Sequence, residues 1–259
     1  MSVTITADDL HAALMGGQLS LAYQPIVDLT TGEPRGIEAL MRWNHPVHGA
    51  IPPSVFIPVA EESGLIVQAS RWALREACAA LKRIIGKIGY DASLFVSVNF
   101  SANDFADENF LEQIYSAISA TDIHPALVRL EITERLLKAN PEQARQTIAL
   151  CRRAGLSIAI DDFSTESSSL AELQGYGIYT VKIDDIKDER IRSIINEAHD
   201  LGMSTIAEGV ETEEEAITLR AMGCEKAQGY YFARPMPEAA LIETLQGWHR
   251  QSLHTAAKA

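Results

Sequence analysis

The chain has 259 residues, 47% of them hydrophobic and 22% charged, so it can bury a sizeable core as one large domain or as two ordinary ones. Its formal net charge of -13 argues against a broad electrostatic grip on polymeric nucleic acid or on an anionic membrane, because both need a positive protein surface. A small anionic ligand stays compatible with this charge if metal ions supply the positive counterpart.

The N-terminus and the cysteines predict a cytoplasmic protein. The opening MSVTITADDL has no basic region followed by an apolar stretch, and no apolar run approaches the length needed to cross a bilayer. The cysteines Cys78, Cys151 and Cys224 are odd in number and far apart, which favours reduced packing residues over a disulfide framework or a zinc site.

The chain lacks an internal boundary. No low-complexity linker, charge block or hinge rich in proline and glycine divides it. We therefore expect a single domain over residues 10–248, preceded by an N-terminal extension over residues 1–9 and followed by a C-terminal tail over residues 249–259.

From the middle of the chain onward, short apolar runs that end in a polar residue alternate with helical patterns. The runs, predicted as strands, cover residues 94–99, 127–131, 156–162, 179–184, 204–208 and 225–228. Apolar residues recur between them at helical spacing, in the stripes Leu74, Cys78, Leu81 and Ile85, then Phe110, Ile114 and Ala117, then Ala144, Ile148 and Cys151. These stripes predict helices that pack one face against the strands.

Helix ends are marked locally. Pro141 suits a first turn, Gly155 follows a last turn, and Thr212 stands three residues before Glu215 as in a capping box. Strands and helices in strict alternation favour an α/β fold, a TIM-barrel-like (β/α)8 barrel, in which functional groups lie at the C-terminal ends of the strands. The rival open, doubly wound sheet needs an early glycine-rich phosphate turn, and that spacing is missing.

Carboxylates stand at the ends of the predicted strands: Glu131, Asp161, Asp162, Asp184 and Glu208. A single one is best interpreted as a solvated edge or a salt bridge, but the whole set, together with Asn99 and Lys182, favours a metal site. Oxygen ligands without His or Cys suit magnesium, manganese or calcium better than zinc. The adjacent pair Asp161 and Asp162 can bridge two ions, the arrangement that activates water against a phosphodiester.

Several longer segments match a known family in the right order: YQPIVDL, GIEALMRW, HPVHGAIPPSVFIPVAEESGLI, SVNFSA, LEITE, AIDDF, VKID, IAEGVET and QGYYFARPMP. They closely resemble the EAL domain, whose members hydrolyse or bind cyclic di-GMP. The match runs from about Leu10 to about Trp248. The resemblance implies a metal-dependent, cyclic-guanylate-specific phosphodiesterase that forms linear pGpG in bacterial second-messenger signalling.

The resemblance also implies roles for individual residues. Two Mg²⁺ or Mn²⁺ ions are expected at Glu38, Asn99, Glu131, Asp161 and Asp162. Lys182 is expected to orient the attacking water, and Glu208 to act as a base or as a further metal-shell ligand. Contacts to the dinucleotide are expected from Gln24, Leu40, Arg42, Gln228 and Pro237.

Plainer interpretations stay open for two of these residues. Arg42 offers a fork to phosphate, yet it could equally form a surface ion pair. Lys182 could simply neutralise Asp184, which stands two residues further along the chain.

The chain departs from the family after its two adjacent aspartates. Where active members carry two glycines and an aromatic residue, residues 164–168 read STESS. The family anchors this loop with a glutamate at the position of Glu134, which is retained, and uses it to couple dimerisation to metal binding. The region 185–190 is also shortened, so the homodimer is in question. A receptor or interaction module that binds cyclic di-GMP with little or no turnover therefore stays open beside the enzyme.

Overall fold

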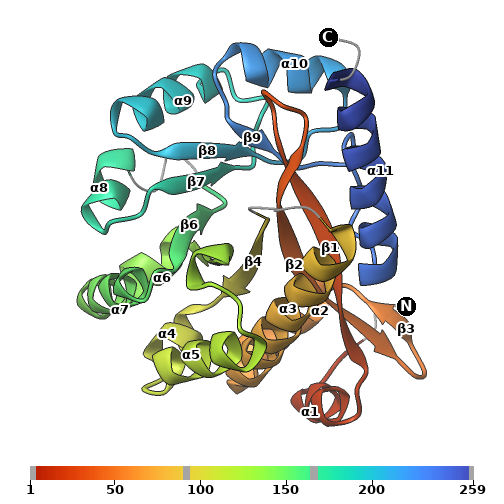
Figure 1. Ribbon diagram of the computed structural model, residues 1–259. Coiled ribbons are helices and arrows are strands. Elements are labelled where there is room, and N and C mark those ends of the chain that lie inside the picture. Colours follow the sequence, from red (N-terminus) through yellow and green to blue (C-terminus); the bar gives the residue numbers. More distant parts are fainter. Residues whose placement is uncertain (1–3, 90–93, 164–168, 257–259) are drawn as a thin grey trace.

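The computed structural model describes residues 4–89, 94–163 and 169–256, with side chains up to residue 248. Helices surround a central group of strands (Figure 1). The strands are β1 (Leu19–Asp28), β2 (Pro34–His45), β3 (Gly49–Ile51), β4 (Phe95–Phe100), β5 (Val128–Thr133), β6 (Ser157–Asp161), β7 (Thr180–Ile183), β8 (Ser204–Ala207) and β9 (Lys226–Ala227). The helices are α1 (Ala7–Met15), α2 (Pro53–Ser63), α3 (Ile66–Ile88), α4 (Ala102–Ala106), α5 (Phe110–Thr121), the short 3-10 helix η1 (Pro125–Leu127), α6 (Glu134–Ala139), α7 (Pro141–Arg153), α8 (Leu170–Gly175), α9 (Ile191–Asp200), α10 (Glu213–Ala221) and α11 (Glu238–Ala256).

The strands close into a barrel. They are hydrogen-bonded in the order β1-β9-β8-β7-β6-β5-β4-β2-β3, and an additional pairing between β1 and β2 closes eight of them into a ring. Neighbours from β2 through β4 to β9 run parallel, whereas β1 is antiparallel to both β2 and β9. The predicted barrel is confirmed, and its first strand runs against the others. The strand β3 is an appendage on β2.

A tight turn explains the reversed first strand. The carboxylate of Asp28, at the end of β1, accepts hydrogen bonds from the backbone N–H groups of Thr30 and Thr31 at 2.9 and 2.8 Å. Gly32 then adopts a φ of 71°, which a residue with a Cβ rarely adopts. A parallel pairing would need a long crossover connection. Because this connection is short, β2 runs back alongside β1 and the two strands form an antiparallel hairpin.

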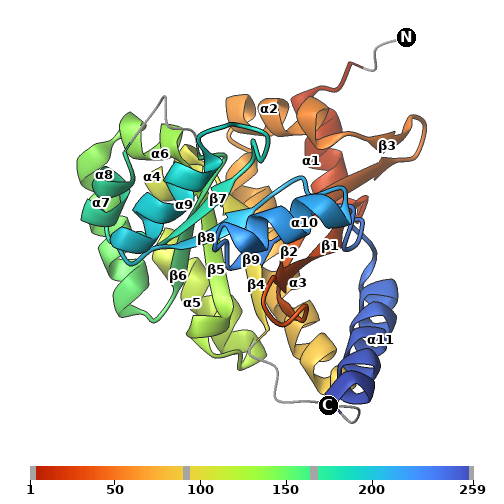
Figure 2. The same cartoon turned by 90° about the horizontal axis from the view of Figure 1, so that it is seen from above.

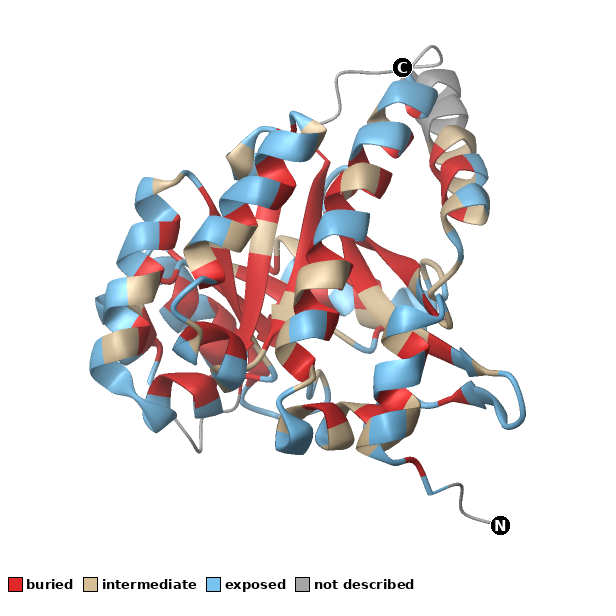
Figure 3. Ribbon diagram, turned by 90° about the horizontal axis from the view of Figure 1, so that it is seen from below, coloured by how far each residue is buried: buried red, intermediate tan, exposed pale blue. Residues whose placement is uncertain are grey.

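The predicted helical stripes form the layer between helices and barrel. Residues such as Leu74, Cys78 and Leu81 of α3 are buried, and Figure 3 shows buried residues on the sides of the helices that face the strands. The predicted helix ends are also found, with Pro141 in the first turn of α7 and a capping box between Thr212 and Glu215 in α10. Local polar signals therefore set the ends of the helices, and apolar burial sets their faces.

A small apolar layer fills the barrel interior below the strand ends. Ile26 of β1, Phe95 of β4 and Ile206 of β8 form this buried cluster. In each case a polar residue stands two positions away, nearer the end of the barrel at which the parallel strands terminate. Because side chains alternate along a strand, the apolar residue and this polar residue both point into the barrel interior. The Phe95 ring lies over Gly36 of β2, where a Cβ atom would come within 2.3 Å of the ring. Glycine is thus required here by close approach.

Helices lie near both ends of the described chain. The helix α1 begins at Ala7 and buries Leu10, and α11 runs from Glu238 to Ala256 alongside the barrel (Figure 2). The predicted domain limits at residues 10 and 248 stay a prediction. Among the helices of residues 4–89, 94–163 and 169–256, none combines the length and hydropathy that a membrane span requires.

We expect Gly36→Ala to lower the free energy of unfolding by about 1–3 kcal/mol, because the added methyl group collides with the Phe95 ring inside a packed barrel. Urea denaturation measures the change. Gly86→Ala is the control: it adds the same methyl group in α3 where no heavy atom lies within 4 Å, and it should be neutral or stabilising. Equal stability of Gly36→Ala and the natural chain would show that the layer is loosely packed.

Candidate metal centre and substrate site

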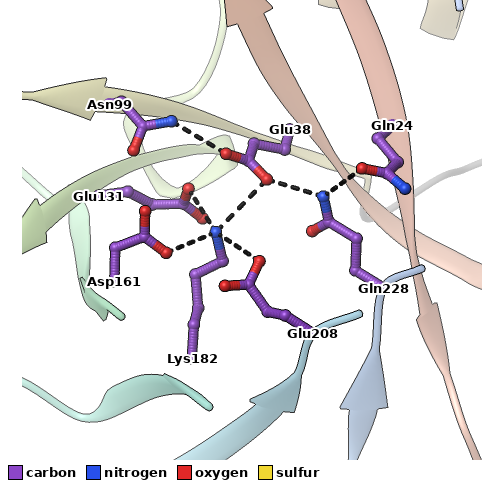
Figure 4. A network of polar contacts seen from close by, with 8 residues as sticks. All are labelled: Gln24, Glu38, Asn99, Glu131, Asp161, Lys182, Glu208 and Gln228. Carbon is purple, nitrogen blue, oxygen red and sulfur yellow. Dashed lines mark hydrogen bonds and ion pairs between the residues drawn. The ribbon is translucent and has the colours of Figure 1, made fainter. Parts of the chain in front are cut away.

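Polar side chains converge at one end of the barrel, where its parallel strands end (Figure 4). They are Glu38 of β2, Asn99 of β4, Glu131 of β5, Asp161 of β6, Lys182 of β7, and Glu208 and Gln228 directly after β8 and β9. Gln24 joins them from the reversed strand β1, where it pairs with Glu38 across the hairpin. Parallel register brings the strand ends to one level, so residues far apart in sequence meet here.

The ammonium group of Lys182 lies at the centre of this group (Figure 4). Its Nζ atom is 2.8 Å from Asp161 Oδ1, 3.0 Å from Glu131 Oε2, 3.0 Å from Glu208 Oε1 and 3.3 Å from Glu38 Oε2. We call these four acidic residues the carboxylate ring. Only 1% of the Lys182 side chain is exposed, so water cannot replace these partners.

Burial and mutual repulsion shift the pKa values of the ring. Burial raises the pKa of Glu131 to about 8, although Lys182 acts in the opposite direction. Burial likewise raises the pKa of Glu208 well above its usual range. Burial by itself lowers the pKa of Lys182, but Glu131, Glu38 and the other ring carboxylates raise it well above its ordinary value. The lysine therefore stays charged, and part of the ring resists ionisation.

Amide groups hold Glu38 from the other side. Gln228 Nε2 donates to Glu38 Oε2 at 2.7 Å and to Gln24 Oε1 at 2.9 Å, while Asn99 Nδ2 donates to Glu38 Oε1 at 2.9 Å. Burial opposes ionisation of Glu38, but Lys182 and these two amide donors together lower its pKa. These contacts therefore favour the ionised form of Glu38.

Asp162 joins the site through an unusual backbone conformation. Consecutive strand residues normally point to opposite faces, but Asp162 has a φ of 53° and ends the alternation after Asp161. Among non-glycine residues Asp tolerates this left-handed region comparatively well, and such outliers gather at functional sites. The turn brings the carboxylates of both aspartates near Glu208.

The ring fits a divalent cation. Two acidic groups, Glu38 with Glu131 and Asp161, and Asp161 with Asp162 and Glu208, each place their ligand oxygens within 4.8 Å of one another. Glu131 Oε1 is buried, and the neighbouring Ser97 hydroxyl does not reach it with the geometry of a hydrogen bond. The carboxylate oxygens carry more negative charge than Lys182 can neutralise, and hard divalent cations prefer such oxygen ligands. Asp161 is common to both groups.

Two cavities open beside the ring. The larger, about 670 Å³, is lined by Leu40, Arg42, Asn99, Asp161 and Asp162, among others. The smaller, about 390 Å³, is lined by Gln24, Glu38, Leu40, Asp184, Glu208, Glu211, Gln228 and Tyr230, with two glycines. Leu40 lines both, so an elongated ligand could lie across this residue with its middle over the carboxylates.

The geometry decides one of the open interpretations and bears on another. The described ion pairs of Lys182 reach the ring carboxylates and not Asp184, so the interpretation that Lys182 simply neutralises Asp184 is wrong. The guanidinium group of Arg42 donates to the backbone carbonyl of Met41 at 2.8 Å and lines the larger cavity.

Pro237 is exposed, and it is not among the residues that line either cavity.

The predicted loop anchor, Glu134, is not one of the ring carboxylates. Glu134 is buried at the start of α6 and has Lys138 at 3.7 Å. Residues 164–168, the altered loop, are outside the described residues. The connection 185–190 is a compact turn in which Asp188 accepts hydrogen bonds from the backbone and side chain of Arg190.

Tyr230 was not singled out from the sequence, although it lines the smaller cavity. Its signal was its place two residues after Gln228, within a segment already matched to the family. The same cavity is lined by Asp184, which the sequence suggested as one of the strand-end carboxylates and as a counter-ion of Lys182, but not as a substrate contact.

A family comparison agrees with this architecture. The EAL domain model matches residues 7–235. The chain belongs to the EAL domain family. This EAL domain is 38% identical over 251 residues to the cyclic di-GMP phosphodiesterase NbdA of Pseudomonas aeruginosa, an alignment that covers 93% of this chain and 32% of NbdA. It is 36% identical over 249 residues to the oxygen sensor protein DosP of Escherichia coli, with coverage of 92% and 30%.

Solved structures share the barrel. The PaMucR phosphodiesterase in complex with c-di-GMP superposes with a TM-score of 0.84 at 36% identity, over 90% of this chain and 98% of that one. The EAL enzyme Bd1971, bound to cAMP and cyclic-di-GMP, gives a TM-score of 0.86 at 31% identity, over 92% and 67% of the two chains. The chain spans about a third of the length of NbdA and DosP.

We expect Mg²⁺ to stabilise this EAL domain more at about pH 8.5 than at about pH 6. A carboxyl whose pKa is raised by folding contributes stability in its protonated form, in full below its unfolded pKa of about 4.3. That contribution is lost as the pH rises through the folded value, about 8 for Glu131. The thermal midpoint in EDTA should therefore fall between these two pH values, and Mg²⁺ should offset the fall by binding the ionised oxygens.

The control for this pH dependence is Glu131→Gln, which keeps the shape of the side chain but removes the titration. The pH dependence of the Mg²⁺ effect should become smaller in this variant, and the remainder is expected from Glu208, whose pKa burial also raises. An equal rise of the thermal midpoint with Mg²⁺ at both pH values in the natural chain would contradict the raised pKa.

Proposed function

We propose that this EAL domain hydrolyses cyclic di-GMP to linear pGpG with the help of divalent cations. The observation that carries the proposal is the carboxylate ring, in which Asp161 is shared by two acidic groups at the junction of two cavities. A shared carboxylate between two cation positions is the arrangement used against phosphodiesters. The named activity of NbdA and the bound dinucleotide of PaMucR support the same substrate.

The proposed cation ligands are the acidic residues and the amide at the strand ends: Glu38, Asn99, Glu131, Asp161 and Asp162. The proposed cofactors are two Mg²⁺ or Mn²⁺ ions, which when bound supply the positive charge that polarises the phosphate and lowers the pKa of a water molecule. For Asn99, the carbonyl oxygen is the proposed ligand, because its Nδ2 group donates to Glu38.

Lys182 and Glu208 have different proposed roles: the lysine orients the attacking water and the glutamate accepts its proton. Because the ring carboxylates raise the pKa of Lys182, this lysine keeps its proton and cannot be a general base, so its N–H groups orient the attacking water. Burial raises the pKa of Glu208 above its usual range, so the ionised form of this carboxylate is a stronger base than an exposed one. Glu208 is therefore the proposed base, and its Oε1 atom lies 3.0 Å from Lys182 Nζ.

Substrate contacts are proposed along the two cavities. Arg42 is a half-buried cation beside the larger cavity and offers a fork to a phosphate oxygen. Leu40 provides the apolar surface between the cavities, and the amides of Gln24 and Gln228 lie in the smaller one. Pro237 is proposed as an outer contact. A dinucleotide spans both cavities with its phosphates over the ring.

The proposed setting is the bacterial cytoplasm, where a cyclic dinucleotide second messenger is made and degraded. The free, buried thiols of Cys78, Cys151 and Cys224 suit a reducing compartment. A homodimer is the further proposed partner, and the altered sequence of residues 164–168 and the shortened region 185–190 argue against it.

The purified protein should convert cyclic di-GMP to pGpG in Mg²⁺ or Mn²⁺, and not in EDTA, when the nucleotides are resolved by chromatography. Asp161→Asn should lower kcat by at least about 100-fold, because it removes the charge that the two acidic groups share. Asp122→Asn, the same change on an exposed carboxylate paired with Lys82, is the matched control and should leave the rate unchanged.

The alternative function is a receptor that binds cyclic di-GMP without turnover. Its support is the altered sequence of residues 164–168, which are outside the described residues. Binding of cyclic di-GMP by calorimetry without any pGpG in either metal would establish the receptor and overturn the enzyme.

A further inference from the structure

A half-exposed aromatic ring forms part of the wall of the smaller cavity. Tyr230 is 52% exposed, although it lines a cavity whose other walls include the buried side chains of Gln24, Glu38 and Gln228. An aromatic ring next to buried polar groups, with much of its surface uncovered, suits a flat partner of comparable size.

The backbone around Tyr230 packs closely against Val210. At Gly229 a Cβ atom would lie 2.1 Å from the carbonyl oxygen of Val210, so only glycine permits the approach of these two segments. Tyr231 N donates to Val210 O at 3.0 Å, and Phe232 N donates to Gly229 O at 3.1 Å. Contacts on both sides thus hold the residue that carries the ring, and the site is built before a ligand arrives.

One face of the Tyr230 ring is already covered by a cation. The guanidinium carbon of Arg234 lies over the ring, 4.1 Å from its centroid. In the part of the chain that the structure describes, Arg234 has no ion pair, so its charge is not neutralised by a neighbouring carboxylate. Arg42 is also near: burial lowers the pKa of Arg42, while Glu38 and the Tyr230 hydroxyl act in the opposite direction.

We propose that Tyr230, backed by Arg234, is a stacking platform for one guanine base of the dinucleotide. The inference rests on the proposed function and adds a residue that fixes one end of the substrate. A base stacked on an exposed tyrosine gains dispersion energy over the whole ring, typically about 1–3 kcal/mol per base. The cation on the opposite face of the ring keeps the tyrosine in place and brings positive charge to an acidic protein that must bind an anion.

The test compares binding and turnover in substituted chains. In EDTA, which withholds the cations needed for hydrolysis, calorimetry gives the Kd for cyclic di-GMP. Tyr230→Ala and Tyr230→Leu should both raise this Kd by about 5-fold or more, and Tyr230→Phe should stay within about 2-fold. With Mg²⁺, KM should rise in the first two variants, while kcat changes much less because the carboxylate ring is untouched.

Two further substitutions show that the effect belongs to this ring. Tyr231→Ala removes an adjacent tyrosine that is 41% exposed and does not line the cavity, so its Kd should match that of the natural chain. Arg234→Ala should raise the Kd by about 2- to 5-fold, and Arg234→Lys should recover most of it. Thermal unfolding confirms that each variant is folded.

Different outcomes of these experiments would overturn the stacking platform and the proposed function. An unchanged Kd and KM in Tyr230→Ala and Tyr230→Leu, with turnover in the natural chain, would overturn the platform alone. Weakened binding in these variants, with no pGpG from the natural chain, would support the platform and overturn the enzyme. A natural chain that neither binds nor hydrolyses cyclic di-GMP would overturn both.

Discussion

The ammonium group of Lys182 lies within 3.3 Å of one oxygen from each of the four ring carboxylates, and the rest of the site is arranged around this contact. Four acidic groups this close together repel one another strongly in a buried environment. Burial raises the pKa values of Glu131 and Glu208, and repulsion that a single lysine offsets only in part acts in the same direction. The same excess of negative charge makes the ring a binding site for divalent cations.

The barrel delivers these groups with few conformational choices. Parallel register brings the ends of the strands to one level, and alternation along each strand places a polar group above the apolar layer of Ile26, Phe95 and Ile206. Two local departures complete the site. The β1–β2 hairpin adds Gln24 from a strand that runs the other way, and the positive φ of Asp162 brings a second carboxylate next to Asp161.

Much of this could be predicted from the sequence, because strands that end in charged residues and helices with apolar stripes leave periodic signals. Asp161 and Asp162 stood out on that basis alone. The reversed β1 was not predicted, since a parallel barrel was assumed although Asp28 and Gly32 carry the signal of a tight turn. The partners of Lys182 were also beyond reach: Asp184 is its neighbour in sequence, whereas Glu38 is 144 residues away and meets it only through barrel closure. Tyr230 was missed because a half-exposed aromatic residue has no periodic signal.

The most direct test of the charge balance in the ring is the free energy of unfolding of Lys182→Met, measured in urea with EDTA and again with Mg²⁺. Removing the central cation from buried carboxylates should lower stability by about 3–5 kcal/mol in EDTA, and Mg²⁺ should restore more stability in the variant than in the natural chain. Lys82→Met, on an exposed lysine paired with Asp122, should change stability by less than about 1 kcal/mol. A Lys182→Met protein as stable as the natural chain in EDTA, with no greater response to Mg²⁺, would contradict this account.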